Sequence, residues 1–210
     1  WREGQLIALF PQPRFLDGLA GAHAVTLSPD GGYVYVAGLY DNSLVVFKRN
    51  LLTGTVGYLK SYKDTVNGFD GLAGTTSVVI SPDSQHLYTT ALNDTGVGVF
   101  DRAADTGLVD FVEAIKRDPN TGLPKLAGAN EAVVSPDGST VYAVSGIDNA
   151  IVAFAVANPK ATIDTLLPAS VQQGATGFTL ILKGKNFVGG SQVQWNGVAR
   201  PTIFVSTGEL

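Results

Sequence analysis

Ser28-Pro29-Asp30-Gly31 is the first of three related turns that decide the fold of this chain. The turn returns as Ser81-Pro82-Asp83 and as Ser135-Pro136-Asp137-Gly138, first 53 and then 54 residues further on. The flanking segments repeat at the same spacing: Leu19-Ala20-Gly21 with Leu72-Ala73-Gly74 and Leu126-Ala127-Gly128, Val34-Tyr35 with Leu87-Tyr88 and Val141-Tyr142, and Phe47 with Phe100 and Phe154. A fixed period of this length is the mark of a repeat architecture.

Each repeat predicts short β-strands separated by turn residues. The run Tyr33 to Gly38 (YVYVAG) is rich in β-branched and aromatic residues, which favour strands. The predicted strands are 22–27, 33–38, 44–49 and 55–62, then 77–80, 86–92, 97–102 and 108–116, then 131–134, 140–145 and 150–156. Four antiparallel strands per unit, joined by short hairpins, are typical of a β-propeller blade.

The predicted fold class is therefore all-β, with three four-stranded propeller blades that form an incomplete ring over residues 1–157. Residues 1–16, which include the apolar run Gly4 to Phe10, are expected to supply the last strand of a preceding blade. We expect the chain to be a segment of a longer polypeptide. Two alternatives are that two copies pair into a six-bladed ring, or that chains join head to tail by strand addition.

Composition excludes several classes of function. The net charge is −4, the pI is about 5.0 and Lys and Arg are not clustered, which argues against nucleic acid or an anionic membrane as a partner. The chain has no Cys, so disulfides and thiolate metal sites are excluded. No apolar run approaches the ~20 residues of a membrane span, so we predict no transmembrane segment.

The runs SPDGGYVYVAG (28–38) and DNSLVVFKR (41–49) resemble lactonase-type seven-bladed propellers and the related YVTN-like surface-protein repeats. The resemblance covers roughly residues 1–157. It implies a possible hydrolase of sugar lactones, with a few charged residues at the mouth of the channel. The candidates here are Glu113, Arg117 and Glu131, which lie in no motif that assigns them a role.

Residues 158–210 have a different pattern, which resembles an IPT/TIG domain, a small immunoglobulin-like β-sandwich. The order is an alternating strand from Phe178 to Gly184, then Asn186-Phe187, then Trp195-Asn196-Gly197. We expect Phe178, Leu180 and Leu182 to face one core together with Val193 and Trp195, and Asn196-Gly197 to form a type I′ hairpin. The domain is predicted to be truncated after Leu210.

Few residues are candidates for chemistry. His23 precedes an inner strand and has two interpretations, an acid/base or ligand role and a polar residue at a strand start; we favour the second. His86 is read as a surface residue beside a turn. Ser28, Ser81 and Ser135 recur with Pro-Asp and are read as turn formers rather than nucleophiles. Tyr40, beside a turn, is a weak candidate for stacking on a sugar.

Acidic turns are the remaining candidates. They offer the oxygen ligands that calcium prefers, but none has the EF-hand spacing, and we favour turn chemistry over a calcium site. They are Asp41-Asn42, Asn93-Asp94, Asp148-Asn149, Asp105-Thr106-Gly107 and Asp118-Pro119-Asn120-Thr121-Gly122. We assign no catalytic and no cofactor-binding residue, and we leave the metal ligands unknown.

The predicted function is a non-catalytic scaffold for binding, adhesion or assembly, secreted or on a bacterial cell surface. Its partner would be a protein, a carbohydrate or further copies of the chain through unpaired edge strands. The alternative is a lactonase-like propeller hydrolase that acts on a sugar lactone.

Overall fold

The computed structural model describes residues 16–157, 161–174, 177–187, 191–206 and 208–210. All of its regular elements are β-strands, so the described part contains no helix able to cross a membrane. The predicted last strand of a preceding blade, Gly4 to Phe10, lies outside the described residues.

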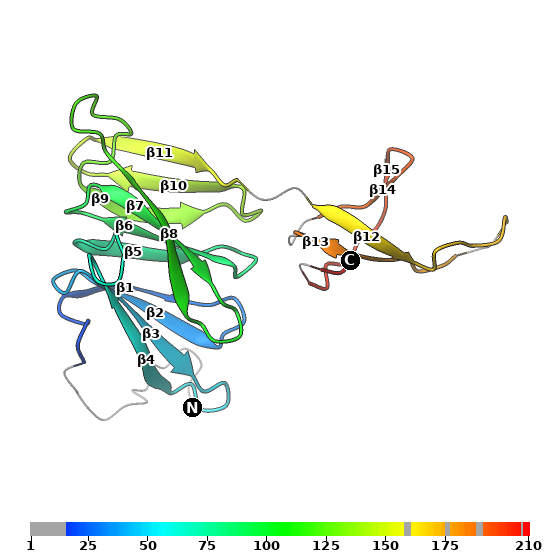
Figure 1. The fold of residues 1–210 in the computed structure, drawn as a ribbon, viewed down its shortest axis with the longest axis horizontal. Coiled ribbons are helices and arrows are strands. Elements are labelled where there is room, and N and C mark those ends of the chain that lie inside the picture. The colour runs from blue at the N-terminus through cyan, green and yellow to red at the C-terminus, as the bar shows by residue number, and fades with distance from the viewer. Residues whose placement is uncertain (1–15, 158–160, 175–176, 188–190, 207) are drawn as a thin grey trace, which may run out of the picture.

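Eleven strands form three antiparallel sheets, each in chain order (Figure 1). The first sheet holds β1 (Ala22–Leu27), β2 (Tyr33–Gly38), β3 (Ser43–Arg49) and β4 (Val56–Lys63). The second holds β5 (Thr75–Ile80), β6 (His86–Ala91), β7 (Gly96–Arg102) and β8 (Val109–Lys116). The third holds β9 (Ala129–Val134), β10 (Thr140–Ser145) and β11 (Ala150–Ala155). This confirms the predicted all-β propeller fold, and every predicted strand in these sheets agrees with an observed one to within two residues. The third sheet has three strands in the described residues, where the prediction of three four-stranded blades expected four.

The Ser-Pro-Asp turns join the first two strands of each sheet through the same hydrogen bonds. Ser28 Oγ accepts the amide proton of Tyr33 at 2.9 Å, and Asp30 Oδ1 accepts that of Gly32 at 2.8 Å. The equivalent pairs are His86 to Ser81 and Gln85 to Asp83, then Thr140 to Ser135 and Ser139 to Asp137. These contacts confirm that the three serines form turns.

The sheets stack face to face, and the core lies between them (Figure 1). The first junction buries Tyr33, Tyr35, Ala37, Leu44, Val46 and Tyr62 of the first sheet against Val78, Leu87, Phe100 and Val109 of the second and against Leu72, which precedes β5. The second junction buries Tyr88 and Val97 against Ala129, Ala132, Val141 and Ala143 of the third sheet and against Leu126, which precedes β9. Each large apolar side chain buried in this way contributes about 1.5–3 kcal/mol.

The C-terminal part has four short strands in two separate sheets. β12 (Thr162–Leu167) pairs with β13 (Ile181–Lys185), and β14 (Gln194–Trp195) pairs with β15 (Val198–Ala199). Asn196 and Gly197 have φ of 51° and 78°, as the predicted type I′ hairpin requires.

The predicted apolar core of residues 158–210 is not formed as expected. Trp195 and Phe178 are both exposed, although Leu182 and Phe187 are buried. The prediction assumed that one alternating face would meet a second sheet, but within the described residues β12–β13 and β14–β15 do not pair with each other. An immunoglobulin-like sandwich is therefore not shown.

Candidate functional site

The first strands of the three sheets, β1, β5 and β9, lie side by side and carry the candidate site. Each strand has a β-bulge near its start, where one residue is left out of the ladder with the second strand. The left-out residues are His23, Thr76 and Asn130, which occupy equivalent positions in the three repeats. Bulges re-aim side chains and are frequent beside active sites.

His23 is exposed, and among the described residues it has one hydrogen-bonding partner. Its Nδ1 lies 2.8 Å from the carbonyl oxygen of Thr76 on the neighbouring sheet. A carbonyl oxygen can only accept a hydrogen bond, so Nδ1 carries the proton of the neutral ring. Nε2 is then the acceptor nitrogen, which is the form that acts as a general base.

Thr76 of the second sheet likewise contacts a backbone carbonyl oxygen of the next sheet, the third. Its Oγ1 lies 3.1 Å from the carbonyl oxygen of Ala129 and 2.9 Å from Thr90 Oγ1, and it is buried. The bulge residues of the first two sheets thus each bind the backbone of the next sheet. His23 lies near the start of β1, and its contact with Thr76 is compatible with both interpretations, a polar residue at a strand start and an acid/base role, so both stay predictions. Sequence reasoning missed Thr76 and Asn130, although the repeat spacing relates both to His23.

Aspartates of the acidic turns accept hydrogen bonds from the segment that precedes the first strand of each sheet. Asp41 Oδ2 accepts the amide protons of Gly18 and Ala20, both at 2.9 Å. Asp94 and Asp148 accept those of Ala73 and Ala127 in the same way. These three aspartates therefore connect their turns to the segment before each sheet, and the preference for turn chemistry over calcium stays a prediction.

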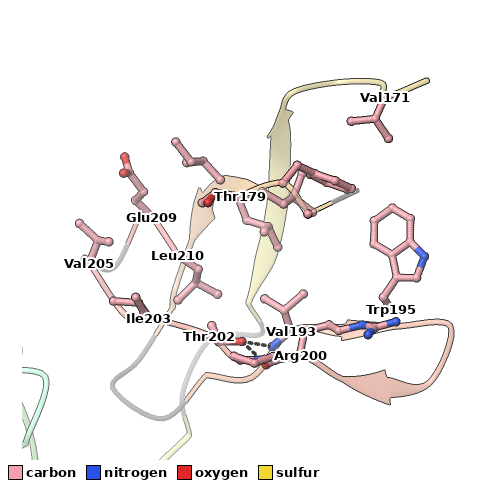
Figure 2. Close-up of a pocket in the computed structure, with 16 residues that line it drawn as sticks. Val171, Thr179, Val193, Trp195, Arg200, Thr202, Ile203, Val205, Glu209 and Leu210 are labelled. Atoms are coloured by element: carbon pink, nitrogen blue, oxygen red, sulfur yellow. Dashed lines mark hydrogen bonds between the residues drawn. The ribbon is translucent and has the colours of Figure 1, made fainter. Parts of the chain in front are cut away.

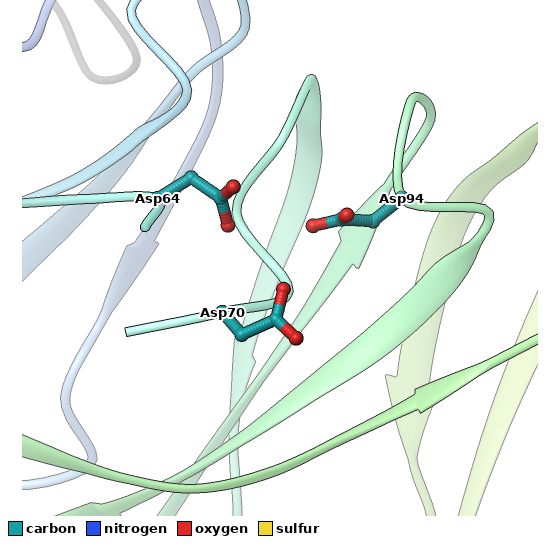
Figure 3. Close-up of side chains that lie close together, drawn as sticks. All are labelled: Asp64, Asp70 and Asp94. Atoms are coloured by element: carbon teal, nitrogen blue, oxygen red, sulfur yellow. The ribbon is translucent and has the colours of Figure 1, made fainter. Parts of the chain in front are cut away.

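A cluster of carboxylates lies at the junction of the first and second sheets. Figure 3 shows Asp64, Asp70 and Asp94 pointing toward one another, and one oxygen from each lies within 4.8 Å of the others. Lys116 Nζ is 2.6 Å from both Asp70 Oδ1 and Asp94 Oδ1. The positive charge of the Lys116 ammonium group thus offsets the negative charge of these carboxylates.

The protonation of the cluster follows from these contacts. Burial, only partly offset by the Leu72 amide, raises the pKa of Asp64. Partial burial would lower the pKa of Lys116, but its hydrogen bonds to Asp70 and Asp94 outweigh that effect and raise it. We conclude that Lys116 is charged and acts as the counter-ion, and the calcium site stays a prediction.

The three charged residues suggested by the lactonase resemblance are not brought together. Glu113 is exposed on β8, the outermost strand of its sheet. Arg117 follows β8 and pairs with Asp148, with Nε and Oδ2 3.2 Å apart. Glu131 lies on β9, opposite Val144. His86, the other histidine, pairs with Asp101 at 3.1 Å beside a turn, as predicted.

A hollow of about 840 Å³ lies in the C-terminal part (Figure 2). Its walls are mainly apolar, and its charged lining residues are Arg200 and Glu209. Thr202 Oγ1 accepts the amide proton of Val193 at 3.0 Å and closes one side. The hollow is lined by the side chains that were predicted to form a sandwich core. Its described lining residues do not include a group of side chains suited to catalysis.

Comparison with known proteins identifies the repeat. A family model described as "Lactonase, 7-bladed beta-propeller" matches residues 19–176. A 6-phosphogluconolactonase from Klebsiella pneumoniae is 24% identical over 180 residues, which are 84% of this chain and 52% of that protein. The chain spans about half the length of the curated relatives it matches.

Solved structures show the same fold. The periplasmic gluconolactonase of Pseudomonas aeruginosa is 22% identical with a TM-score of 0.51, over 62% of this chain and 34% of that one. A functionally unknown protein from Desulfotomaculum acetoxidans is 20% identical with a TM-score of 0.52, over 68% and 42%. The prediction of a non-catalytic scaffold is wrong on these findings, because the family model and the relatives from Klebsiella pneumoniae and Pseudomonas aeruginosa are described as lactonases.

Proposed function

This chain belongs to the lactonase family of seven-bladed β-propellers, and from this premise we propose that it forms part of an enzyme that hydrolyses a sugar lactone. The observation that carries the proposal is the family match, which covers all three sheets and runs on to residue 176. The named relatives support a gluconolactone or its 6-phosphate as the substrate.

Lactone hydrolysis asks for two proton transfers. Water must lose a proton as its oxygen attacks the carbonyl carbon, and the ring oxygen must gain one as the acyl carbon–oxygen bond breaks. A histidine with one free nitrogen suits both steps, because its ordinary pKa lies near neutrality. His23 is our candidate, since its contact with Thr76 fixes the tautomer and makes Nε2 the acceptor nitrogen, which bonds to no other residue in the described part of the chain.

The test is lactone turnover by the whole chain, measured as acid release above the spontaneous rate. We expect His23→Gln to lower kcat about 100-fold or more, as for loss of a general base, while a Gln amide can still donate to the Thr76 carbonyl. His86→Gln is the matched control and should keep full activity, because His86 pairs with Asp101 away from the bulges. Activity that survives His23→Gln would remove His23 from the mechanism. No turnover by the unaltered chain would count against the function itself.

We further propose three features from the sequence: an IPT/TIG-like domain at residues 158–210, a domain boundary near residue 157 and an extracellular location. The IPT/TIG resemblance of residues 158–210 is supported by the order of Asn186-Phe187 and Trp195-Asn196-Gly197.

A further inference from the structure

Tyr40 lies in the hairpin that joins β2 to β3, and hydrogen bonds fix this hairpin beside the start of β1. The Leu39 amide donates to the carbonyl oxygen of Gly21 at 3.0 Å. The Tyr40 amide donates to that of Ala20, also at 3.0 Å. Asp41, the next residue, accepts two further amide protons from the same segment. The backbone of Tyr40 is therefore held by the segment that precedes β1.

The phenol ring of Tyr40 lies directly over Gly21. A Cβ atom at Gly21 would lie 2.6 Å from Tyr40 Cδ2 and 2.9 Å from its Cγ, closer than real Cβ atoms approach. Glycine at this position therefore makes room for the ring. Tyr40 is nevertheless 76% exposed. The ring is thus supported by backbone on one side and open to solvent elsewhere.

The exposure of Tyr40 follows from its position in the repeat and not from its place in the first sheet. The equivalent residue of the second sheet is Asn93, which is exposed although this sheet has a neighbouring sheet on both sides. In the third sheet the equivalent is Ile147, which is 70% exposed. Both residues also lie over a glycine at the same spacing, Gly74 and Gly128. The position therefore projects from the end of the stack, where no sheet-to-sheet junction covers it.

Tyr40 and His23 lie at the same end of the first sheet. Ala22 pairs with Gly38 in the ladder between β1 and β2. His23 follows Ala22 and is left out of that ladder, and Tyr40 follows Gly38 by two residues. Both side chains thus leave the backbone next to the same pair of residues. Because both are exposed, one small ligand can contact both.

A fixed and exposed aromatic ring is suited to a sugar. The C–H groups on one face of a sugar ring carry a partial positive charge, and the face of an aromatic ring is negative. Tyr has few rotamers to lose, so a contact through its ring costs little conformational entropy. The equivalent positions hold an amide in Asn93 and an aliphatic side chain in Ile147. Among the three described hairpins, Tyr40 alone therefore offers an aromatic ring.

We propose that the ring of Tyr40 stacks on the six-membered ring of the sugar lactone and forms the sugar-binding subsite beside His23. This inference rests on the proposed function for the identity of the ligand. Tyr40 binds the sugar, whereas His23 transfers protons. Loss of the Tyr40 ring therefore weakens binding and leaves the proton transfers in place.

The test is the binding of gluconolactam, the lactam analogue of gluconolactone, to the whole chain. Calorimetry and saturation-transfer NMR measure its Kd. We expect Tyr40→Asn to weaken binding about five- to tenfold, as for loss of one aromatic contact, and Tyr40→Phe to stay within about twofold because it keeps the ring. The second sheet already holds Asn at this position, so Tyr40→Asn should keep the unfolding midpoint of the unaltered chain in circular dichroism.

Ile147→Ala is the matched control. It shortens the exposed side chain over the equivalent glycine of the third sheet and should leave the Kd for gluconolactam unchanged. Unchanged binding by Tyr40→Asn would overturn the inference, and so would the absence of binding by the unaltered chain.

Turnover separates this inference from the proposed function. With gluconolactone as substrate, Tyr40→Asn should raise KM by the same factor as the Kd for the lactam, while kcat should fall far less than in His23→Gln. Hydrolysis with the same KM in Tyr40→Asn and the unaltered chain would keep the function and remove the subsite. Lactam binding that depends on Tyr40, in a chain without turnover, would keep the subsite and contradict the proposed function.

Discussion

Arg102 is the residue on which the first junction most depends. A fully buried guanidinium is tolerated only when its donors are satisfied, and here they bind a hydroxyl, a carbonyl and a carboxylate. The ring of Tyr33 adds a cation–π contact at 5.4 Å. Partial burial acts to raise the pKa of Asp30, but hydrogen bonds from Ser28 and Gly32 and the charge of Arg102 lower it overall. The Asp30 carboxylate is therefore ionised and holds its charge against Arg102.

We expect Arg102→Ala to lower the free energy of unfolding by about 2–3 kcal/mol, since it removes charge-assisted hydrogen bonds from a buried site. Urea unfolding followed by circular dichroism measures this change. Lys48→Ala, on β3 of the first sheet, is exposed and should change stability by less than about 0.5 kcal/mol. Equal stability of the Arg102 variant and the unaltered chain would show that the junction is held by apolar contacts alone.

For single residues, the sequence predicts which positions are equivalent in the three repeats better than it predicts what each side chain does. The spacing places His23, Thr76 and Asn130 in register, but a bulge depends on how two strands pair, which a single strand does not reveal. Glu113, Arg117 and Glu131 were grouped by charge, yet they lie on an outer strand, after that strand and on an inner strand. Charge identifies a candidate, but only the sheet topology decides which candidates meet.

At the scale of the elements, the two inner junctions differ in their polar chemistry. The second junction has Tyr88 where the first has Tyr35, but it has Val156 where the first has Arg102. Burial, with smaller effects from Asp83 and Asp101, raises the pKa of Tyr88 to about 12. The Tyr88 hydroxyl is therefore kept neutral by its apolar setting.

This pKa predicts a loss of stability in alkali. The pKa of Tyr88 is higher in the folded state than its ordinary value of about 10. The contribution of the neutral Tyr88 hydroxyl to the free energy of unfolding is therefore complete below pH 10, and it is lost as the pH rises through about 12. Unfolding by urea at pH 8 and at pH 11 should show a smaller alkaline loss for Tyr88→Phe than for the unaltered chain. Tyr40→Phe serves as the control, because Tyr40 is exposed. Equal losses in all three proteins would contradict the assignment.

The strands themselves follow closely from the sequence, because each repeat supports the other two. The predicted and observed bounds of 33–38 and 140–145 are the same, since turn residues and alternating side chains agree there. The C-terminal part has no internal repeat to confirm its pattern. Its alternation at 178–182 predicted a buried face, but alternation alone cannot supply the second sheet that would cover it.

At the scale of the whole molecule, stability is concentrated in the three stacked sheets. Their two junctions bury a continuous set of large side chains, whereas the described residues after 160 bury mainly Leu182 and Phe187. β14 and β15 are two residues each, and β12 is exposed along its length. Since slow amide exchange requires strands that open only with the core, protection should follow the same division.

Hydrogen exchange followed by mass spectrometry checks this division. The amides of β2, β3, β6 and β7 should stay protected from exchange for hours. Each of these strands is paired with a strand on both sides and carries side chains that are buried in the core. Peptides from β12 to β15 should exchange within minutes, because few buried contacts oppose their opening. Peptides from the edge strand β11 provide the internal control, and their exchange rate should lie between the rates of these two groups. Slow exchange throughout 178–205 would contradict the division, and it would mean that this part gains the second sheet its sequence predicted.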